Sequence, residues 1–143
     1  MLLDNQTGLR AAPDMHESKS FALVAEDTEL GRWAIARALQ AAGFEVCLSG
    51  SWVESAGWLD RIDFDVAVMA LSCDRHDIAS ITSHLRREHA RTKLVVLALQ
   101  DDVGAIRQAA APDVVVMEKP LNVEQVVRAA KSATQPGVVA KGA

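Results

Sequence analysis

Five short runs of apolar residues are spaced along the chain, and they predict five β-strands. Four of the runs are continuously apolar, which is typical of strands covered on both faces of a parallel sheet. The run at 44–48 alternates apolar and polar residues, which favours a position at an edge of the sheet. The five runs are 21–25, 44–48, 66–71, 94–99 and 114–117.

Amphipathic segments separate these runs, and each is long enough for one crossover helix. Thr28 and Ser51 are suited to cap the N-termini of the first two helices, and Gly43 is suited to end the first. The expected helices run from Thr28 to Ala42, from Ser51 through Ile62, from about Asp77 to His89, from Asp101 to Ala110, and onward from Pro120. The residues expected to pack inward from the first, second, third and fifth helices are Ala34, Ile35, Ala38, Leu39, Ala42, Val53, Ala56, Leu59, Ile62, Ile78, Ile81, Leu85, Val123, Val126, Val127 and Ala130.

Strands that alternate with helices predict an α/β fold, here a (βα)5 doubly wound, five-stranded parallel sheet. Residues 21–134 form this predicted domain. Residues 1–20 show no helical or strand periodicity and are expected to be a flexible leader. A flexible tail is expected over 135–143, where Pro136 and two glycines interrupt any helix.

The composition favours a soluble globular domain and excludes several classes of function. The 143 residues carry a net charge of −4, with 4% aromatic residues and no tyrosine, so a nucleic-acid-binding surface is not expected. No apolar run approaches the ~18 residues of a membrane span. Cys47 and Cys73 form no CxxC pair, which favours a reducing compartment. We therefore expect a cytoplasmic protein that contacts neither nucleic acid nor membrane.

Charged residues follow the predicted strands at the edge where such sheets bind ligands. Glu26 and Asp27 follow the first strand, and Lys119 and Pro120 follow the fifth. The first turn has no glycine-rich phosphate loop, and its two carboxylates would repel a phosphate. Nucleotide binding is therefore not expected at this edge.

The acidic pair after the first strand, together with Lys-Pro after the fifth, resembles the receiver domain of two-component response regulators. The resemblance spans about 21–134 and implies a flavodoxin-like receiver fold. It also implies that Glu26 and Asp27 match the family's acidic pair, that Lys119 matches its lysine, and that Pro120 matches a proline the family usually holds in cis.

The resemblance implies a definite chemistry for that edge. In the family, an Asp at the end of the third strand accepts a phosphoryl group from a kinase phosphohistidine. Mg²⁺ held by that Asp and the acidic pair neutralises the transferred charge. A Ser or Thr after the fourth strand and the lysine after the fifth bind the phosphoryl oxygens. The movement of that hydroxyl is coupled to an aromatic residue on the fifth strand and changes the surface formed by the fourth helix, fifth strand and fifth helix.

This sequence departs from the family at three of these positions. Ala70 falls at the phosphoacceptor position, Ala98 at the switch hydroxyl and Val116 at the switch aromatic. Alanine offers neither a nucleophile nor a metal ligand. We therefore predict a degenerate pseudo-receiver: a phosphorylation-independent signalling module that is not an enzyme and has no catalytic residues and no required cofactor. Glu26 and Asp27 are expected to hold Mg²⁺ only weakly, with a dissociation constant of about a millimolar or above.

Two alternatives stay open. One is an active phosphorelay receiver with a displaced acceptor such as Asp74, four residues past Ala70. The other is a small α/β ligand-binding protein or enzyme that uses the acidic turn and Cys73. The cluster of Cys73, Asp74, His76 and Asp77 lacks the four well-spaced Cys or His ligands of a structural zinc site.

A receiver-like module without phosphotransfer is expected to act through protein partners. These would be a histidine kinase, a phosphotransferase or a transcription component, and a homodimer is a further alternative. Val116 and Met117 fall on the surface of the fourth helix, fifth strand and fifth helix that receivers use for dimers and outputs. Trp33 and Trp58 lie beside the inward stripes of the first two helices, and tryptophan is enriched at binding hot spots. These four residues are the predicted partner surface, with Val116 at the preferred contact.

Overall fold

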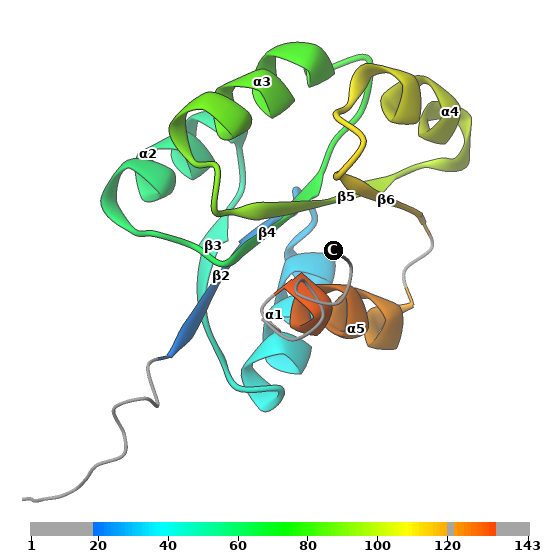
Figure 1. Cartoon of the computed structure of the whole chain (residues 1–143). Coiled ribbons are helices and arrows are strands. Elements are labelled where there is room, and N and C mark those ends of the chain that lie inside the picture. The colour runs from blue at the N-terminus through cyan, green and yellow to red at the C-terminus, as the bar shows by residue number, and fades with distance from the viewer. Residues whose placement is uncertain (1–18, 120–121, 134–143) are drawn as a thin grey trace, which may run out of the picture.

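The computed structural model describes residues 19–119 and 122–133, in which five strands and five helices alternate (Figure 1). The predicted (βα)5 order is confirmed. The elements are β2 (Ser20–Ala25), α1 (Glu29–Ala41), β3 (Phe44–Ser49), α2 (Trp52–Arg61), β4 (Val66–Ala70), α3 (Ile78–Glu88), β5 (Lys93–Ala98), α4 (Gln100–Ala109), β6 (Val115–Glu118) and α5 (Val123–Ala133).

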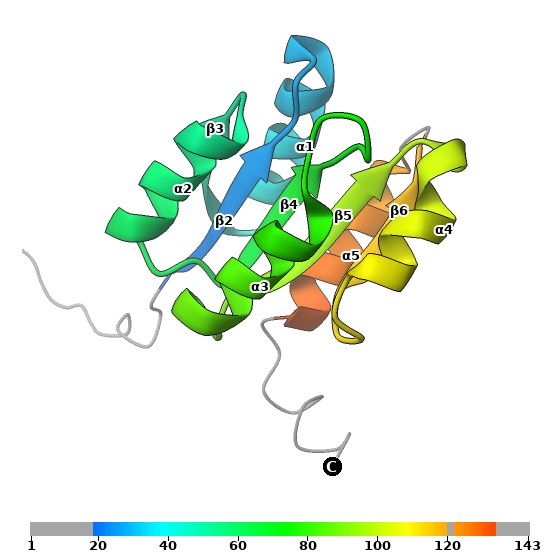
Figure 2. The same ribbon diagram turned by 90° about the horizontal axis from the view of Figure 1, so that it is seen from above.

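The strands form one parallel sheet in the order β3-β2-β4-β5-β6, so their carboxyl ends meet at one edge (Figure 2). The run at 44–48 lies at an edge as β3, as its alternating pattern predicts. Ala25 pairs with Met69 across β2 and β4, and Ala98 pairs with Glu118 across β5 and β6. This register brings the residues that follow β2, β4 and β6 to the same edge.

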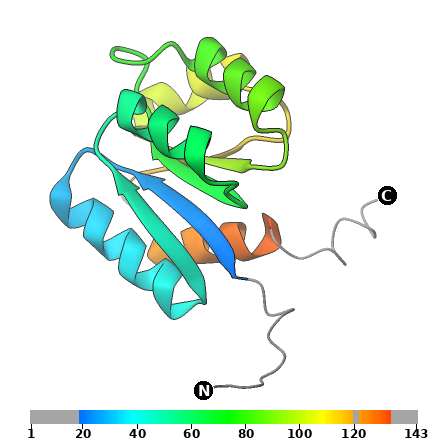
Figure 3. The same cartoon turned by 90° about the vertical axis from the view of Figure 1, so that its left-hand side faces the viewer.

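Helices cover both faces of the sheet. α1 and α5 lie against one face, and α2, α3 and α4 lie against the other (Figures 1 and 3). Alternate residues of β4 serve the two layers, since Val66 and Val68 pack toward α1 and α5, whereas Ala67 and Met69 pack toward α2 to α4. This double burial explains why the central strands are continuously apolar.

The predicted N-termini of the first three helices are confirmed by their hydrogen bonds. Thr28, Ser51 and Asp77 each accept a bond from the amide N–H three residues later, which satisfies a donor that the first helical turn would leave unpaired. Gly43 follows α1 with φ of +102°, a conformation that side chains with a Cβ rarely adopt.

The prediction that Val53 packs inward is wrong. Its side chain is 81% exposed, while Ser55 and Leu59 face the sheet from α2. The helix begins at Trp52, and at about 100° per residue Val53 lies about 120° around the axis from Leu59. The inward stripe is therefore 52, 55 and 59.

The expectation that the run at 114–117 is a central strand is wrong. Its residues 115–117 belong to β6, an edge strand with β5 as its neighbour, and Val115 is 42% exposed. Leu99 also lies outside its predicted strand, exposed at the start of α4. Ser20 belongs to β2 rather than to the predicted leader.

Residues 1–18 and 134–143, which carry most of the predicted leader and tail, lie outside the described residues. No helix within 19–119 or 122–133 is long and apolar enough to cross a membrane.

Candidate functional site

The candidate site lies at the carboxyl edge of the sheet, beside a cavity of about 480 Å³. The ends of β2 and β4 form its floor, and the N-terminal turns of α2 and α3 form its walls. Glu26, Asp27, Ala70, Arg75 and Trp52 are among the residues that line it. The acidic turn and the residue at the end of β4 therefore share one cavity, as expected from the positions of the strand ends.

Glu26 is a buried carboxylate whose two oxygens both accept hydrogen bonds. Lys119 Nζ lies 2.9 Å from Oε1, so the two form an ion pair between the ends of β2 and β6. Thr28 donates to Oε2 from its amide, at 3.0 Å, and from its hydroxyl, at 2.9 Å. A buried charge is tolerated when it is paired and hydrogen-bonded in this way.

Gly31 allows this compact arrangement of the β2–α1 turn. A Cβ at Gly31 would lie 2.7 Å from Thr28 Oγ1 and 3.2 Å from Glu26 Cγ. Contacts this short require the threonine cap or the glutamate to move. The lack of a side chain at Gly31 therefore contributes to the position of the buried carboxylate.

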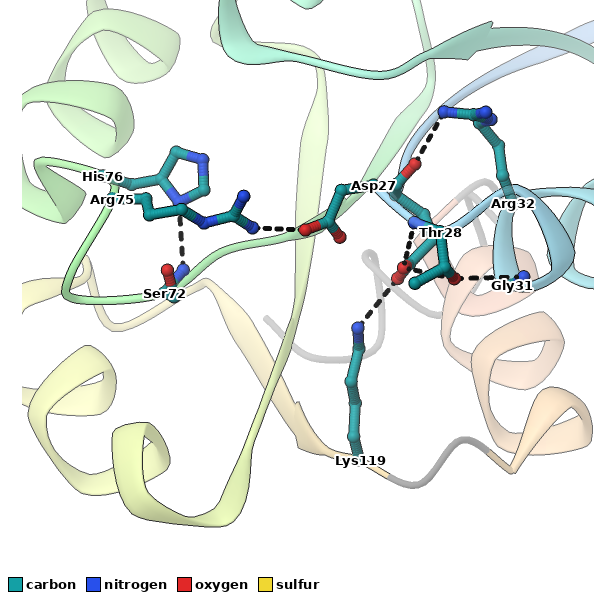
Figure 4. Close-up of polar contacts among 9 residues, drawn as sticks. Asp27, Thr28, Gly31, Arg32, Ser72, Arg75, His76 and Lys119 are labelled. Atoms are coloured by element: carbon teal, nitrogen blue, oxygen red, sulfur yellow. Dashed lines mark hydrogen bonds and ion pairs between the residues drawn. The ribbon is translucent and has the colours of Figure 1, made fainter.

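Asp27 pairs with a different cation from Glu26. Its carboxylate accepts a hydrogen bond from the Arg75 guanidinium, which comes from the loop between β4 and α3 (Figure 4). This hydrogen bond is the main reason that the pKa of Asp27 lies below its usual value of 3.8. The side chains of Arg75 and Asp27 are 58% and 40% exposed, so water screens the pair more than it screens Glu26 and Lys119.

Arg75 is held in position by a tight turn of the β4–α3 loop. Its amide donates to Ser72 O at 3.3 Å, and the His76 amide donates to the same oxygen at 2.9 Å. In return, the Ser72 amide donates to His76 Nδ1 at 3.0 Å. The sequence interpretation missed Arg75. The available signal was that Arg75 is the only Lys or Arg between Arg61 and Arg86, in an acidic loop at the carboxyl edge of the predicted sheet.

The alanines identified from the sequence lie at the same edge as the charged residues. Ala70 is partly exposed and lines the cavity with Glu26 and Asp27. Ala98 is buried, and its carbonyl accepts a hydrogen bond of 2.8 Å from the Lys119 amide. The structure therefore brings together Glu26, Asp27, Ala70, Ala98 and Lys119. Pro120 lies outside the described residues.

The donors at this edge do not suit a magnesium ion. Mg²⁺ prefers an octahedral set of oxygen ligands that includes carboxylates. Here Lys119 and Thr28 already bind Glu26, Arg75 binds Asp27, and Ala70 offers no side-chain oxygen. Within the described ranges, no group of three or more His, Cys, Asp or Glu side chains could hold a metal ion.

Cys73 and Asp74, the residues of the two alternatives, both lie exposed in the β4–α3 loop. Asp74 is not among the side chains that line the cavity, whereas its neighbours Arg75 and His76 are. Desolvation and the carboxylates of Asp102 and Asp74 raise the pKa of the Cys73 thiol, which disfavours a reactive thiolate. Cys73 therefore lacks the surroundings of a nucleophile, and Asp74 lies outside the cavity lining.

The four predicted partner-surface residues differ in exposure. Val116 and Met117 are half-buried and pack against the cores on opposite faces of the sheet. Trp58 is partly buried, and its indole N–H donates to Leu48 O at 3.0 Å. Trp33 is 56% exposed, with the Arg37 guanidinium 4.8 Å from its ring centre. Of these four, Trp33 offers the most accessible apolar surface.

No protein-family model matches the sequence, and no curated protein matches it by sequence. Solved structures match its fold. A response regulator receiver protein from Sinorhizobium medicae is 19% identical, with a TM-score of 0.72, over 82% of this chain and 95% of that one. A response regulator from Thermotoga maritima is 20% identical, with a TM-score of 0.66, over 81% and 98% of the two chains.

The receiver domain of a sensor histidine kinase from Pseudomonas aeruginosa is 22% identical, with a TM-score of 0.65, over 80% of this chain and 96% of that domain. That structure holds a magnesium ion coordinated in its active-site cleft. The chain described here therefore has the flavodoxin-like fold of receiver domains, and the fold expected from the acidic pair and Lys-Pro is confirmed.

Proposed function

We propose that this protein is a receiver-like signalling module of a two-component or phosphorelay system that works without phosphorylation. It is not an enzyme on this proposal and needs no cofactor, and it acts by contact with other proteins. The supporting observation is Ala70, which lines the cavity beside Glu26 and Asp27 at the end of β4. A receiver that transfers phosphate needs an aspartate there, and a methyl group can neither attack phosphorus nor bind a metal.

Ala98 and Val116 support the same proposal. Ala98 lies next to Lys119 at the end of β5, where a receiver would carry the hydroxyl that binds the phosphoryl group. Val116 has no aromatic ring to change position, and it packs against the apolar core. With these three positions apolar, the pair of Glu26 and Lys119 is left with a structural role.

Acetyl phosphate with Mg²⁺, followed by intact-mass measurement, tests this proposal. We expect no phosphoryl adduct on the wild-type chain. An adduct that is lost in Asp74→Asn would overturn the proposal in favour of an active receiver with a displaced acceptor. Ser83→Ala is a suitable control variant because Ser83 is an exposed residue on α3 that lies outside the cavity lining.

The partner on this proposal is a histidine kinase, a phosphotransferase, a transcription component or a second copy of the chain. Val116→Arg on β6 and Trp33→Ala on α1 compare the two available faces in sedimentation and pull-down experiments. Loss of association in Val116→Arg alone supports the β6 face. Loss in Trp33→Ala alone moves the partner surface to α1, where the more exposed side chain lies.

The cavity is the observation that favours a second candidate, a small-ligand-binding protein. Its volume of about 480 Å³ is within the usual range for small-molecule sites. A thermal-shift screen with metals, nucleotides and small metabolites distinguishes this candidate. We expect no shift, and a saturable shift that Ala70→Phe abolishes would favour ligand binding.

A further inference from the structure

Each carboxylate of the β2–α1 turn has its own cation. Glu26 is paired with Lys119 from the end of β6, and Asp27 is paired with Arg75 from the β4–α3 loop (Figure 4). These cations lie 93 and 48 residues away in the sequence. The two negative charges that would attract a divalent cation are therefore already neutralised by the fold.

Charge, rather than lack of space, distinguishes this site from one that binds metal. The cavity beside Asp27 and Ala70 has a volume of about 480 Å³, which is ample for a hydrated ion. A divalent cation that approached Asp27 would meet the Arg75 guanidinium within a few ångströms. At that distance like charges repel strongly, even when water screens them in part.

We propose that Arg75 is the resident cation of this site and that its guanidinium occupies, at Asp27, the place that a divalent metal ion would need. The two carboxylates of the β2–α1 turn are then paired within the chain itself, and the wild-type protein binds Mg²⁺ at most weakly. This inference goes beyond the proposed function, because it concerns metal binding and not phosphotransfer or protein contact.

The geometry of the loop supports this role for Arg75. Hydrogen bonds between Ser72 and the two residues Arg75 and His76 close the turn, so the base of the Arg75 side chain is fixed. The ion pair of Arg75 and Asp27 thereby links the loop after β4 to the loop after β2 beside the cavity that Ala70 lines.

The test compares Arg75→Met with a matched control, Arg86→Met. Arg86 pairs with Asp113 at similar exposure, 57% and 53%, and neither residue lines the cavity. Each protein is titrated with Mn²⁺, and separately with Mg²⁺, at constant ionic strength. Affinity is measured by electron paramagnetic resonance of free Mn²⁺, and the site is identified from the broadening of backbone amide signals.

We expect Arg75→Met to bind Mn²⁺ about fivefold more tightly than the wild type, a difference of about 1 kcal/mol. Broadening should centre on Asp27 and Ala70. The Arg86→Met variant should match the wild type. Equal affinities in all three proteins, or equal gains in the two variants, would overturn the proposal. The phosphorylation test gives its result independently, since it uses the wild-type chain and asks only whether a phosphoryl group is added.

A second measurement applies if Arg75→Met does not fold. The guanidinium Nε–H signal of Arg75 in the wild-type protein is followed while Mg²⁺ is raised about tenfold above the millimolar affinity of weak sites. A signal that stays in place shows that Mg²⁺ does not displace Arg75. A saturable shift of this signal, without a shift of the Arg86 signal, would overturn the proposal.

Discussion

Glu26 and Asp27 are neighbours in one turn and carry the same functional group, but the fold treats them differently. Glu26 is 2% exposed and has three donors around its carboxylate, whereas the Asp27 side chain is 40% exposed and pairs with one arginine. Burial sets the energetic importance of each pair, because an unpaired charge costs far more in the interior than in water. The buried pair of Glu26 and Lys119 should therefore control the stability of the fold. The exposed pair of Asp27 and Arg75 should control which ions can approach the site.

The largest effect is expected from Lys119→Met. This change leaves the Glu26 carboxylate buried without its cation, which should lower the free energy of unfolding by about 3 kcal/mol. Urea unfolding at neutral pH measures the loss. Lys93→Met is the control, since Lys93 is an exposed lysine on β5. A second substitution, Glu26→Gln, in the Lys119→Met background should recover most of the loss. Equal losses in Lys119→Met and Lys93→Met would show that the buried pair of Glu26 and Lys119 contributes no more to stability than an exposed lysine does.

An intermediate effect is expected from Gly31→Ala. In most helix interiors this change stabilises a protein by up to about 1 kcal/mol. At Gly31 the new Cβ would press on Thr28 Oγ1 and on Glu26, so we expect a loss of about 1 kcal/mol instead. Gly104→Ala on α4 is the control, since nothing lies within 4 Å of a Cβ there, and it should be neutral or stabilising. Thermal unfolding of both variants checks the contrast in sign.

The sequence predicted the fold well because the signals that carry it are local. Caps at Thr28 and Ser51 and the alternation of strands and helices depend on neighbouring residues. Exposure was predicted less well, because it depends on which elements meet. Val115 is exposed because β6 is at an edge, and no pattern within 114–117 reveals a missing neighbour strand.

The candidate site, too, could be predicted from the sequence only in part. Glu26 and Lys119 could be brought together from the sequence, because parallel strands end at one edge of a sheet. Arg75 could not be assigned in this way, because its reach depends on the turn that Ser72 and His76 close within a loop. Loop geometry of this kind has no periodicity in the sequence, so the second cation was found only in the structure.

The smallest effect is expected at the exposed pair, and it depends on pH. The pKa of Asp27 is lowered in the folded protein. Its contact with Arg75 therefore stabilises the fold at pH values above the ordinary pKa of 3.8, and this stabilisation is lost as the pH falls through the lowered pKa. We expect Arg75→Met to lower the free energy of unfolding by about 0.5 kcal/mol near neutral pH. The difference from wild type should shrink as the pH falls below 3.8.

Urea unfolding of wild type and Arg75→Met, at neutral pH and at a series of pH values below 3.8, measures this effect. Arg91→Met is the control, because Arg91 lies near Asp63 and Asp65 at the opposite edge of the sheet. A loss near neutral pH as large as that of Lys119→Met would contradict the comparison between the two carboxylates.

The distance in sequence between Glu26 and Lys119 has a consequence for the order of folding. Lys119 follows β6, so it reaches Glu26 only after β6 has joined the sheet at the edge of β5. Contacts across 93 residues require closure of a long loop, and such contacts commonly form late. Glu26 would then stay hydrated through most of folding and lose its water in the final step. An interaction that is absent from the transition state acts on the rate of unfolding, so this ion pair should slow the opening of the native domain and leave its folding rate unchanged.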